Sequence, residues 1–192
     1  MVPRRWTRLA RERIQSCRVF DVHRSRARSP QTGQLHDFFG IESSDWVNVI
    51  PFTPRGDVVM VRQYRHGADR VTLEVPGGIV DPGEAPVDAA VRELLEETGY
   101  RAEEIEPLGS VNPNPALFGN RLHAFVARGA RRVAEVVNDR TEETRVEVVP
   151  RASLWQMVRS GEVDHALVVA AVGLLALAEL GAGEASGGAG GP

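Results

Sequence analysis

The sequence contains little cysteine and has no apolar segment long enough to span a bilayer. Its single cysteine, Cys17, has no second cysteine as a partner, which excludes an internal disulfide and favours a reducing compartment. We expect Cys17 to be a core residue of a strand. The longest apolar run, Ala166 to Ala178, is well short of the roughly 20 residues that a membrane helix needs. We therefore expect a buried helix there and no membrane partner.

A secretory leader, a strong net charge and a zinc motif are also missing. The first fifteen residues are basic but lack the continuous apolar stretch of a signal peptide, so we expect a cytoplasmic protein. The net charge of −3 gives no general attraction to nucleic acid, and no nucleic-acid partner is expected. The five histidines lack metal-ligand spacing, which argues against zinc. They are His23, His36, His66, His123 and His165.

The length of 192 residues fits one well-buried domain with small appendages. We expect residues 1–44 to form an N-terminal segment, residues 45–180 the main domain, and the glycine-rich residues 181–192 a disordered tail. Within the N-terminal segment, an ordered lead-in over residues 1–15 precedes a β-hairpin. The hairpin pairs Cys17–His23 with His36–Ile41, because a Ser-Pro-Gln-Thr-Gly turn separates these two stretches.

A second hairpin is predicted where Trp46–Thr53 and Val58–Val61 flank a Pro-Arg-Gly-Asp turn. Its outgoing strand carries Arg62 and Arg65, and we expect both side chains to point to the same face. Exposed arginines on a strand are often only solvated. A guanidinium also binds phosphate oxygens in a bidentate manner, so both residues are candidates for substrate binding.

A glycine turn followed by an acidic helix is the most informative stretch of the chain. Pro86 suits the first helical position, Asp88 lies in the first turn, and Gly99 is a stop signal. At 100° per residue, one side of this helix is charged and the other packs. The side expected to pack contains Val87, Ala90, Val91, Leu94, Leu95 and Thr98.

Three carboxylates converge on the charged side of this helix. Glu93 and Glu97 are four residues apart, and Glu96 lies three residues after Glu93. A solvated acidic face is the plain alternative, but like charges within one turn repel unless a cation lies among them. Mg²⁺ and Mn²⁺ prefer carboxylate and carbonyl oxygen. Arg92 is spaced to reach both Glu84 and Glu96 and would hold the carboxylates in a fixed orientation.

The spaced residues of this stretch resemble the signature of the Nudix hydrolase family. The matching positions are Gly78, Glu84, Arg92, Glu93, Leu94, Glu96, Glu97 and Gly99. The resemblance implies an α/β (α+β) fold, which is an α-β-α sandwich with a mixed β-sheet. It also implies an enzyme that hydrolyses nucleoside diphosphates linked to another group. It also implies Mg²⁺ (or Mn²⁺) as cofactor. The implied metal ligands are Gly77 through its carbonyl, Glu93, Glu96 and Glu97, with Glu97 also catalytic.

Motifs outside this signature resemble the ADP-ribose and nucleoside diphosphate sugar pyrophosphatase branch. They are V-R-Q-Y-R-H-G, L-E-V-P-G-G, a proline at Pro115, E-E-T-R-V-E-V-V-P and G-E-V-D-H-A-L. The resemblance implies a substrate-binding role for Pro115 and a catalytic role for Glu142 or Glu143, without a choice between these two. It also implies a homodimer, for which residues 1–44 would provide a contact.

The segment around Pro115 differs from the corresponding loop of strict ADP-ribose enzymes, which leaves the sugar and base preference open. Polar residues in and after it either contact a sugar or phosphate or satisfy the loop backbone. They are Asn114, Asn120, Arg121 and His123. Two alternative functions also remain: a Nudix hydrolase for another nucleotide, such as a triphosphate or dinucleoside polyphosphate, and a non-catalytic nucleotide-binding sensor.

Overall fold

The protein was analysed as a computed structural model that describes residues 2–138 and 143–187, with side chains described up to residue 181. The chain divides into two compact units. The first, called the N-terminal unit, contains residues 1–44 and 112–121. The second, called the main unit, contains residues 45–111 and the chain from 122 onward.

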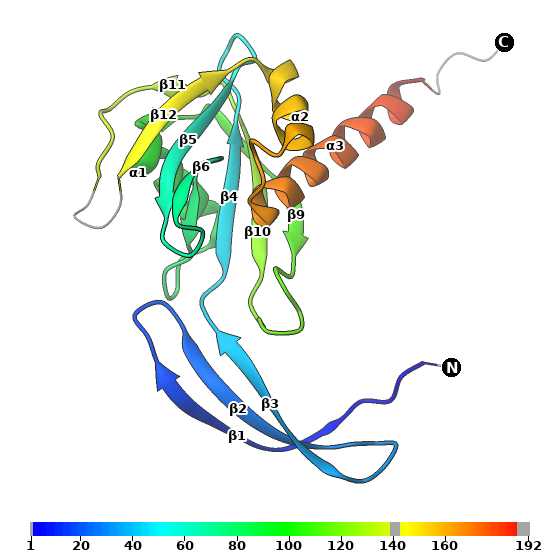
Figure 1. The fold of residues 1–192 in the computed structure, drawn as a ribbon. Coiled ribbons are helices and arrows are strands. Elements are labelled where there is room, and N and C mark those ends of the chain that lie inside the picture. Colours follow the sequence, from blue (N-terminus) through cyan, green and yellow to red (C-terminus); the bar gives the residue numbers. More distant parts are fainter. Residues whose placement is uncertain (1, 139–142, 188–192) are drawn as a thin grey trace, which may run out of the picture. The chain divides into compact units, whose positions relative to one another are not determined.

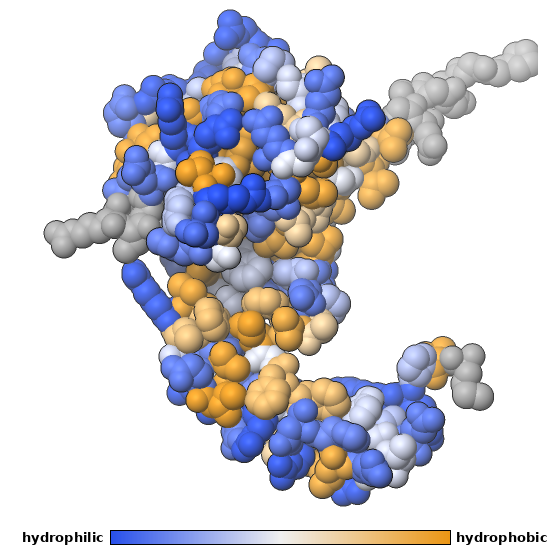
Figure 2. Space-filling model, viewed as in Figure 1, coloured by the Kyte–Doolittle hydropathy of each residue, from blue (hydrophilic) through white to orange (hydrophobic). Residues whose placement is uncertain are grey.

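The N-terminal unit is a three-stranded antiparallel sheet of β1 (Thr7–Ser16), β2 (Asp21–Arg28) and β3 (Leu35–Glu42). The predicted hairpin is present as the antiparallel pair of β2 and β3, although β2 begins at Asp21 and not at Cys17. The lead-in was not expected to be a strand, but most of it forms β1, which pairs with β2. All ten residues of β1 are exposed. Apolar surface is visible on this unit among hydrophilic surface (Figure 2). Its exposed apolar side chains include Leu9 and Phe39. Such a sheet buries little apolar surface of its own.

Cys17 is exposed in the turn between β1 and β2, so its prediction as a core residue is wrong. Strand β1 ends at Ser16, one residue before it. The segment 112–121 belongs to this same unit, because the Ile41 N–H donates to the Leu117 carbonyl at 2.8 Å.

The main unit contains a mixed four-stranded sheet in the order β7-β4-β10-β9 (Figure 1). Strands β4 and β10 are parallel, and the other pairs are antiparallel. The strands are β4 (Trp46–Pro51), β7 (Gly77–Ile79), β9 (Glu104–Val111) and β10 (Leu122–Arg128).

Alternation along β4 and β10 explains why helices cover both faces of this sheet. Val47, Val49 and Phe125 pack in one core cluster with Ala90 and Leu94 of α1 (Pro86–Thr98). The neighbouring positions, such as Ile50 and Val126, pack in a second cluster with α3 (Ala166–Gly187). The predicted α-β-α sandwich with a mixed sheet is thereby confirmed.

A second sheet in the main unit has the order β12-β5-β6, and a short ribbon pairs β11 with β8. Strands β4 and β5 therefore do not form the predicted hairpin. An isolated bridge between Phe52 and Val58 joins them, because β4 already has β7 and β10 along its edges. The elements are β5 (Val58–Arg65), β6 (Arg70–Glu74), β8 (Tyr100–Arg101), β11 (Arg131–Arg132), β12 (Thr144–Val149) and α2 (Arg151–Ser160).

Helix α1 has the predicted bounds and ends at Gly99 in the left-handed conformation, φ 71°. Its predicted apolar side is only partly buried, because Val87 and Val91 are 41% and 43% exposed. Helix α3 was predicted to be buried, but Leu177 on its outer side is exposed. It also continues to Gly187 and so includes the first seven residues of the expected tail. Among the described residues, no helix is long and apolar enough to cross a membrane.

Candidate active site

Two consecutive glycines of β7 lie against two carboxylates of α1. The Gly77 N–H donates to Oε2 of Glu97 at 2.9 Å, and Glu97 is only 8% exposed. A β-carbon at Gly78 would lie 2.2 Å from Oε1 of Glu93, so any larger residue would displace this carboxylate. The glycine turn thus lets Glu93 and Glu97 approach one stretch of backbone.

Arg92 connects the acidic side of α1 to the same backbone. Its guanidinium donates to both carboxylate oxygens of Glu84, at 3.0 and 2.9 Å, and to Oε1 of Glu93 at 2.7 Å. It also reaches the Ile79 carbonyl at 3.0 Å and Glu96 at 3.3 Å. The predicted contacts of Arg92 with Glu84 and Glu96 are confirmed, and this one side chain orients three glutamates.

The charge of Arg92 changes the ionisation of its main partner. Hydrogen bonds from Arg92, with a further one from the Asp81 N–H, lower the pKa of Glu84 to about 2. The same contact with Glu84 raises the pKa of Arg92 above its usual value. Glu84 is therefore ionised at every physiological pH and keeps Arg92 beside Glu93.

The chemistry of these residues fits a hard divalent cation. Glu93 and Glu97 both lie against the Gly77–Gly78 backbone, which provides the oxygen-rich environment that Mg²⁺ and Mn²⁺ require. Glu96 is half exposed and bound to Arg92. Within residues 2–138 and 143–187, three or more His, Cys, Asp or Glu side chains do not converge as a ready cluster. Two carboxylates and a glycine backbone fit the cation.

The C-terminal end of α1 is held by the chain that follows β11. The Val133 N–H donates to the Gly99 carbonyl at 2.8 Å, and the Val137 N–H donates to the Glu96 carbonyl at 3.1 Å. A β-carbon at Gly99 would lie 2.1 Å from the Ala134 carbonyl oxygen. Gly99 is therefore needed both for its positive φ and for this close approach. Carbonyls that would lack partners at a helix end are satisfied here.

Of the two candidate catalytic glutamates, Glu142 lies outside the described residues. Glu143 is exposed and directly precedes β12. Its neighbour Thr144 donates through Oγ1 to the Glu97 carbonyl at 3.1 Å. The side chain of Asn138 accepts from the Thr144 N–H at 2.9 Å and closes the base of this loop. Thr144, which follows Glu143, is thus attached to the last turn of α1.

Arg62 and Arg65 have different partners. Arg62 binds Glu147 at 2.5 Å and Glu162 at 3.2 Å, whereas both Nε and Nη2 of Arg65 donate to Glu74 at 2.8 Å. Residues three positions apart in a strand point to opposite faces, so the prediction of a shared face is wrong.

The sequence interpretation missed Glu74, the last residue of β6. Its side chain is 3% exposed and also accepts from Oγ1 of Thr72 at 2.6 Å. Burial raises the pKa of Glu74, but the hydrogen bonds from Arg65 and His165 outweigh this effect and hold the pKa well below its usual range. A charged residue inside the otherwise apolar stretch L-E-V is the signal that could have drawn attention to it, because a buried carboxylate needs cationic partners.

Pro115 lies in the segment 112–121, which belongs to the N-terminal unit. The polar residues around it satisfy backbone groups. Asn114 accepts from the Ala116 N–H at 3.2 Å, and Asn120 donates to the Ser44 carbonyl at 2.8 Å. In the main unit, Nε2 of His123 lies 2.9 Å from Asp45. For Asn114 and Asn120, these contacts are those expected of loop structure.

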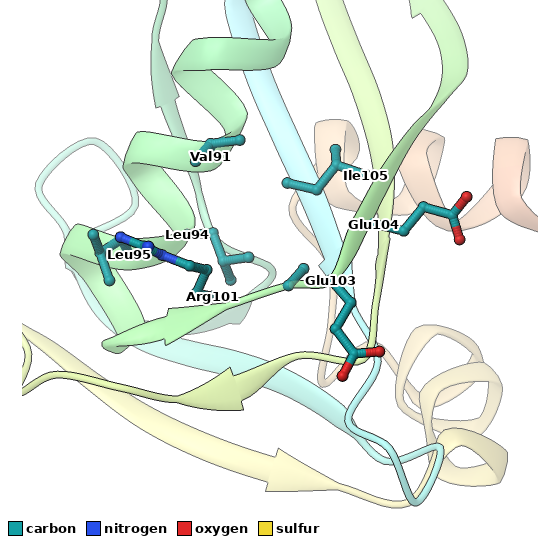
Figure 3. Close-up of a pocket in the computed structure, with 8 residues that line it drawn as sticks. Val91, Leu94, Leu95, Arg101, Glu103, Glu104 and Ile105 are labelled. Carbon is teal, nitrogen blue, oxygen red and sulfur yellow. The ribbon is translucent and has the colours of Figure 1, made fainter.

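A cavity of about 200 Å³ lies on another side of α1 (Figure 3). Val91, Leu94 and Leu95 line it from the helix, and Ile105 of β9 lines it from across the cavity. None of the candidate metal ligands lines this cavity, so it is separate from the site at the glycine turn.

Known proteins are similar to this chain in sequence and in fold. A family model for the NUDIX domain matches residues 44–172. The chain is 31% identical over 173 residues to the ADP-ribose pyrophosphatase of Bacillus subtilis, covering 89% of this chain and 92% of that protein. It is 28% identical over 171 residues to the ADP-ribose pyrophosphatase of Mycobacterium tuberculosis, covering 85% and 80%.

A solved structure described as an ADP compounds hydrolase superposes with a TM-score of 0.82. It has 23% sequence identity and covers 95% of this chain and 98% of its own. This likeness concerns the fold. An α-β-α sandwich in which an acidic helix lies against a glycine turn is typical of proteins that bind phosphate compounds together with divalent metals. With the family model matching most of its length, the chain belongs to the NUDIX domain family.

Proposed function

We propose that this protein is a divalent-metal-dependent hydrolase. It cleaves the pyrophosphate of ADP-ribose or a related nucleoside diphosphate sugar to a nucleoside monophosphate and a sugar phosphate. The observation that carries this proposal is the placement of Glu93 and Glu97 against the Gly77–Gly78 backbone. Similarity to ADP-ribose pyrophosphatases over most of the chain supports the substrate class.

We assign the cofactor as Mg²⁺ (or Mn²⁺), held by Glu93, Glu96, Glu97 and the Gly77 carbonyl. When bound, such an ion neutralises the charge of the pyrophosphate and lowers the pKa of a coordinated water. The protein residues around it prepare this site. Arg92 fixes Glu93 through contacts that Glu84 maintains, and the Gly77 N–H fixes Glu97.

The remaining groups bind the substrate and move the proton. Arg65, whose side chain is 40% exposed, is assigned to a substrate phosphate. Arg62 is a weaker candidate for this role, because its guanidinium already forms ion pairs with Glu147 and Glu162. Glu142 or Glu143 accepts a proton from the attacking water. The loop base at Thr144, which is bound to the Glu97 carbonyl, supports this role for the pair. We also propose Pro115 as a substrate-binding residue.

We also propose a cytoplasmic homodimer. The single cysteine supports a reducing compartment. The exposed apolar side chains of the N-terminal unit support association with a second copy, since a sheet of three strands gains stability by covering such surface. Light scattering on the purified protein tests the dimer, and a mass of one chain would contradict it.

The test of the activity is a substrate panel with Mg²⁺ and, separately, Mn²⁺. ADP-ribose, ADP-glucose, GDP-mannose, NADH and nucleoside triphosphates are incubated with the protein, and nucleoside monophosphate is measured. We expect release of AMP from ADP-ribose and none after chelation of the metal. If only the triphosphates are hydrolysed, the protein would be assigned to another branch of the family. Binding of ADP-ribose without turnover of any compound would indicate a sensor.

A further inference from the structure

Each oxygen of the Glu74 carboxylate has two polar neighbours. Oε1 accepts from Nε of Arg65 and from Oγ1 of Thr72, at 2.8 and 2.6 Å. Oε2 accepts from Nη2 of Arg65 at 2.8 Å and lies 3.0 Å from Nδ1 of His165. The side chain is almost completely buried, and a buried carboxylate is stable only when its oxygens are satisfied. His165 therefore provides one of the four polar contacts around this carboxylate.

His165 reaches Glu74 from the connector between α2 and α3. Two further ion pairs hold this connector on β5 and β6: Glu162 with Arg62 at 3.2 Å, and Asp164 with Arg70. Between them, Val163 is fully buried. The position of His165 is thus set by contacts that do not involve Glu74.

Arg65 gains a defined orientation from this arrangement. A guanidinium is planar, so a bidentate pair along its Nε and Nη2 edge fixes the plane of the whole group. Nη1 takes no part in the pair with Glu74, and the side chain is 40% exposed. A cation that is held in place before the ligand arrives loses less entropy on binding a phosphate.

We propose that His165 is a positioning residue for Arg65 and acts through Glu74. The inference rests on the proposed function to the extent that Arg65 binds a substrate phosphate. Without His165, Oε2 of Glu74 keeps Nη2 of Arg65 as its one polar neighbour, and the orientation of the carboxylate and its arginine is less restricted. The expected result is weaker binding of the nucleoside diphosphate compound with little change in the chemical step.

The first measurement is the steady-state kinetics of His165→Ala with ADP-ribose. We expect KM to rise about fivefold, consistent with one lost contact to a charged group that is partly screened, while kcat stays within about twofold. His165→Asn places an amide N–H near the position of Nδ1 and should restore most of the KM. The matched control is Asp164→Asn, which breaks the neighbouring pair with Arg70 and leaves Glu74 intact. An equal rise of KM in this control would overturn the inference, because the role of His165 would then be general docking of the connector.

The second measurement is the Kd of ADP-ribose by calorimetry in EDTA, where no turnover occurs. Arg65→Ala and His165→Ala should each weaken binding, and the double variant should bind no more weakly than Arg65→Ala alone. Additive losses would contradict action through Arg65. An unchanged Kd in Arg65→Ala would overturn both this inference and the assignment of Arg65. If no substrate is hydrolysed but the Kd pattern holds, the proposed enzymatic function fails while the positioning role stands.

Discussion

The two units of the chain use the same type of ion pair in different surroundings. The chain contains 23 arginines and no lysine. In the N-terminal unit, arginines meet carboxylates on an open sheet, as Arg26 does with Asp37 at 2.8 Å and Arg13 with Asp21 at 3.1 Å. In the main unit, Arg65 meets the buried Glu74 at the same 2.8 Å.

Equal distances in the two units therefore do not imply equal contributions. Exposed pairs are screened by water and lose side-chain entropy, so that each is worth about 0–1 kcal/mol. A buried carboxylate must keep its partners, because an unpaired charge inside the protein is costly. The difference indicates that the buried pair in the main unit fixes geometry, whereas exposed pairs such as those of the N-terminal unit mainly keep the surface polar.

The largest effect is expected from Glu97→Gln. The amide oxygen can still accept from the Gly77 N–H, so the fold should survive, but the proposed metal ligand loses its negative charge. We expect kcat to fall by about a hundredfold or more, comparable to the loss of other groups that stabilise charge in the transition state. Glu104→Gln, which removes an exposed charge from β9, is the control. Unchanged turnover of Glu97→Gln would refute the metal assignment.

A smaller effect is expected from Glu84→Gln, which weakens the hold on Arg92. Partners that orient a metal ligand change metal affinity by about 10- to 100-fold when they are replaced. We expect the Mg²⁺ concentration for half-maximal rate to rise about tenfold, with a near-normal rate at saturating Mg²⁺. Glu103→Gln, which removes an exposed pair with Arg131, provides the comparison. An unaltered Mg²⁺ requirement would show that Arg92 does not prepare the site.

The effect of Glu74→Gln should be seen mainly in the pH dependence of the free energy of unfolding. The folded protein holds the pKa of Glu74 below its usual 4.5, so this group stabilises the fold above pH 4.5, and the contribution is lost as the pH falls below that value. We expect the variant to lose about 1–2 kcal/mol at pH 7, after allowance for the exposure of Arg65. Thermal unfolding from pH 7 to pH 3 should show a shallower decline than in the unmodified protein. Parallel curves would contradict this account.

The smallest effect is expected from Asp37→Asn in the N-terminal unit. Arg26 lowers the pKa of Asp37 by hydrogen bonding, but both side chains remain in contact with water. The melting temperature should change by less than about 2 °C and the hydrolysis rate should not change. A large loss of stability would remove the distinction between the two units.

Features that depend on neighbouring residues were predictable from the sequence. Helix α1 has the expected start at Pro86 and the expected end at Gly99, because helix caps and periodicity are local signals. The contact between Arg92 and Glu84 followed from their spacing around the start of α1.

Features that depend on distant partners were not predictable in the same way. Strands β4 and β5 were recognised, but the turn between them gave no sign that β4 would pair with β7 and β10. Arg62 and Arg65 were assigned to one face despite a separation of three residues. His165 was set aside for lack of metal-ligand spacing, and its contact with Glu74 emerges only when the connector folds onto β6.

The range of these contacts along the chain has a consequence for the order in which the protein acquires its properties. Arg92 and Glu84 are 8 residues apart, whereas Arg62 and Glu162 are 100 apart and Arg70 and Asp164 are 94 apart. Short-range contacts form early, and long-range contacts wait for loop closure. During synthesis from the N-terminus, the acidic helix is complete long before the connector to α3 has emerged. The contact between Arg92 and Glu84 can therefore form before the chain that carries His165 to Glu74 has been synthesised.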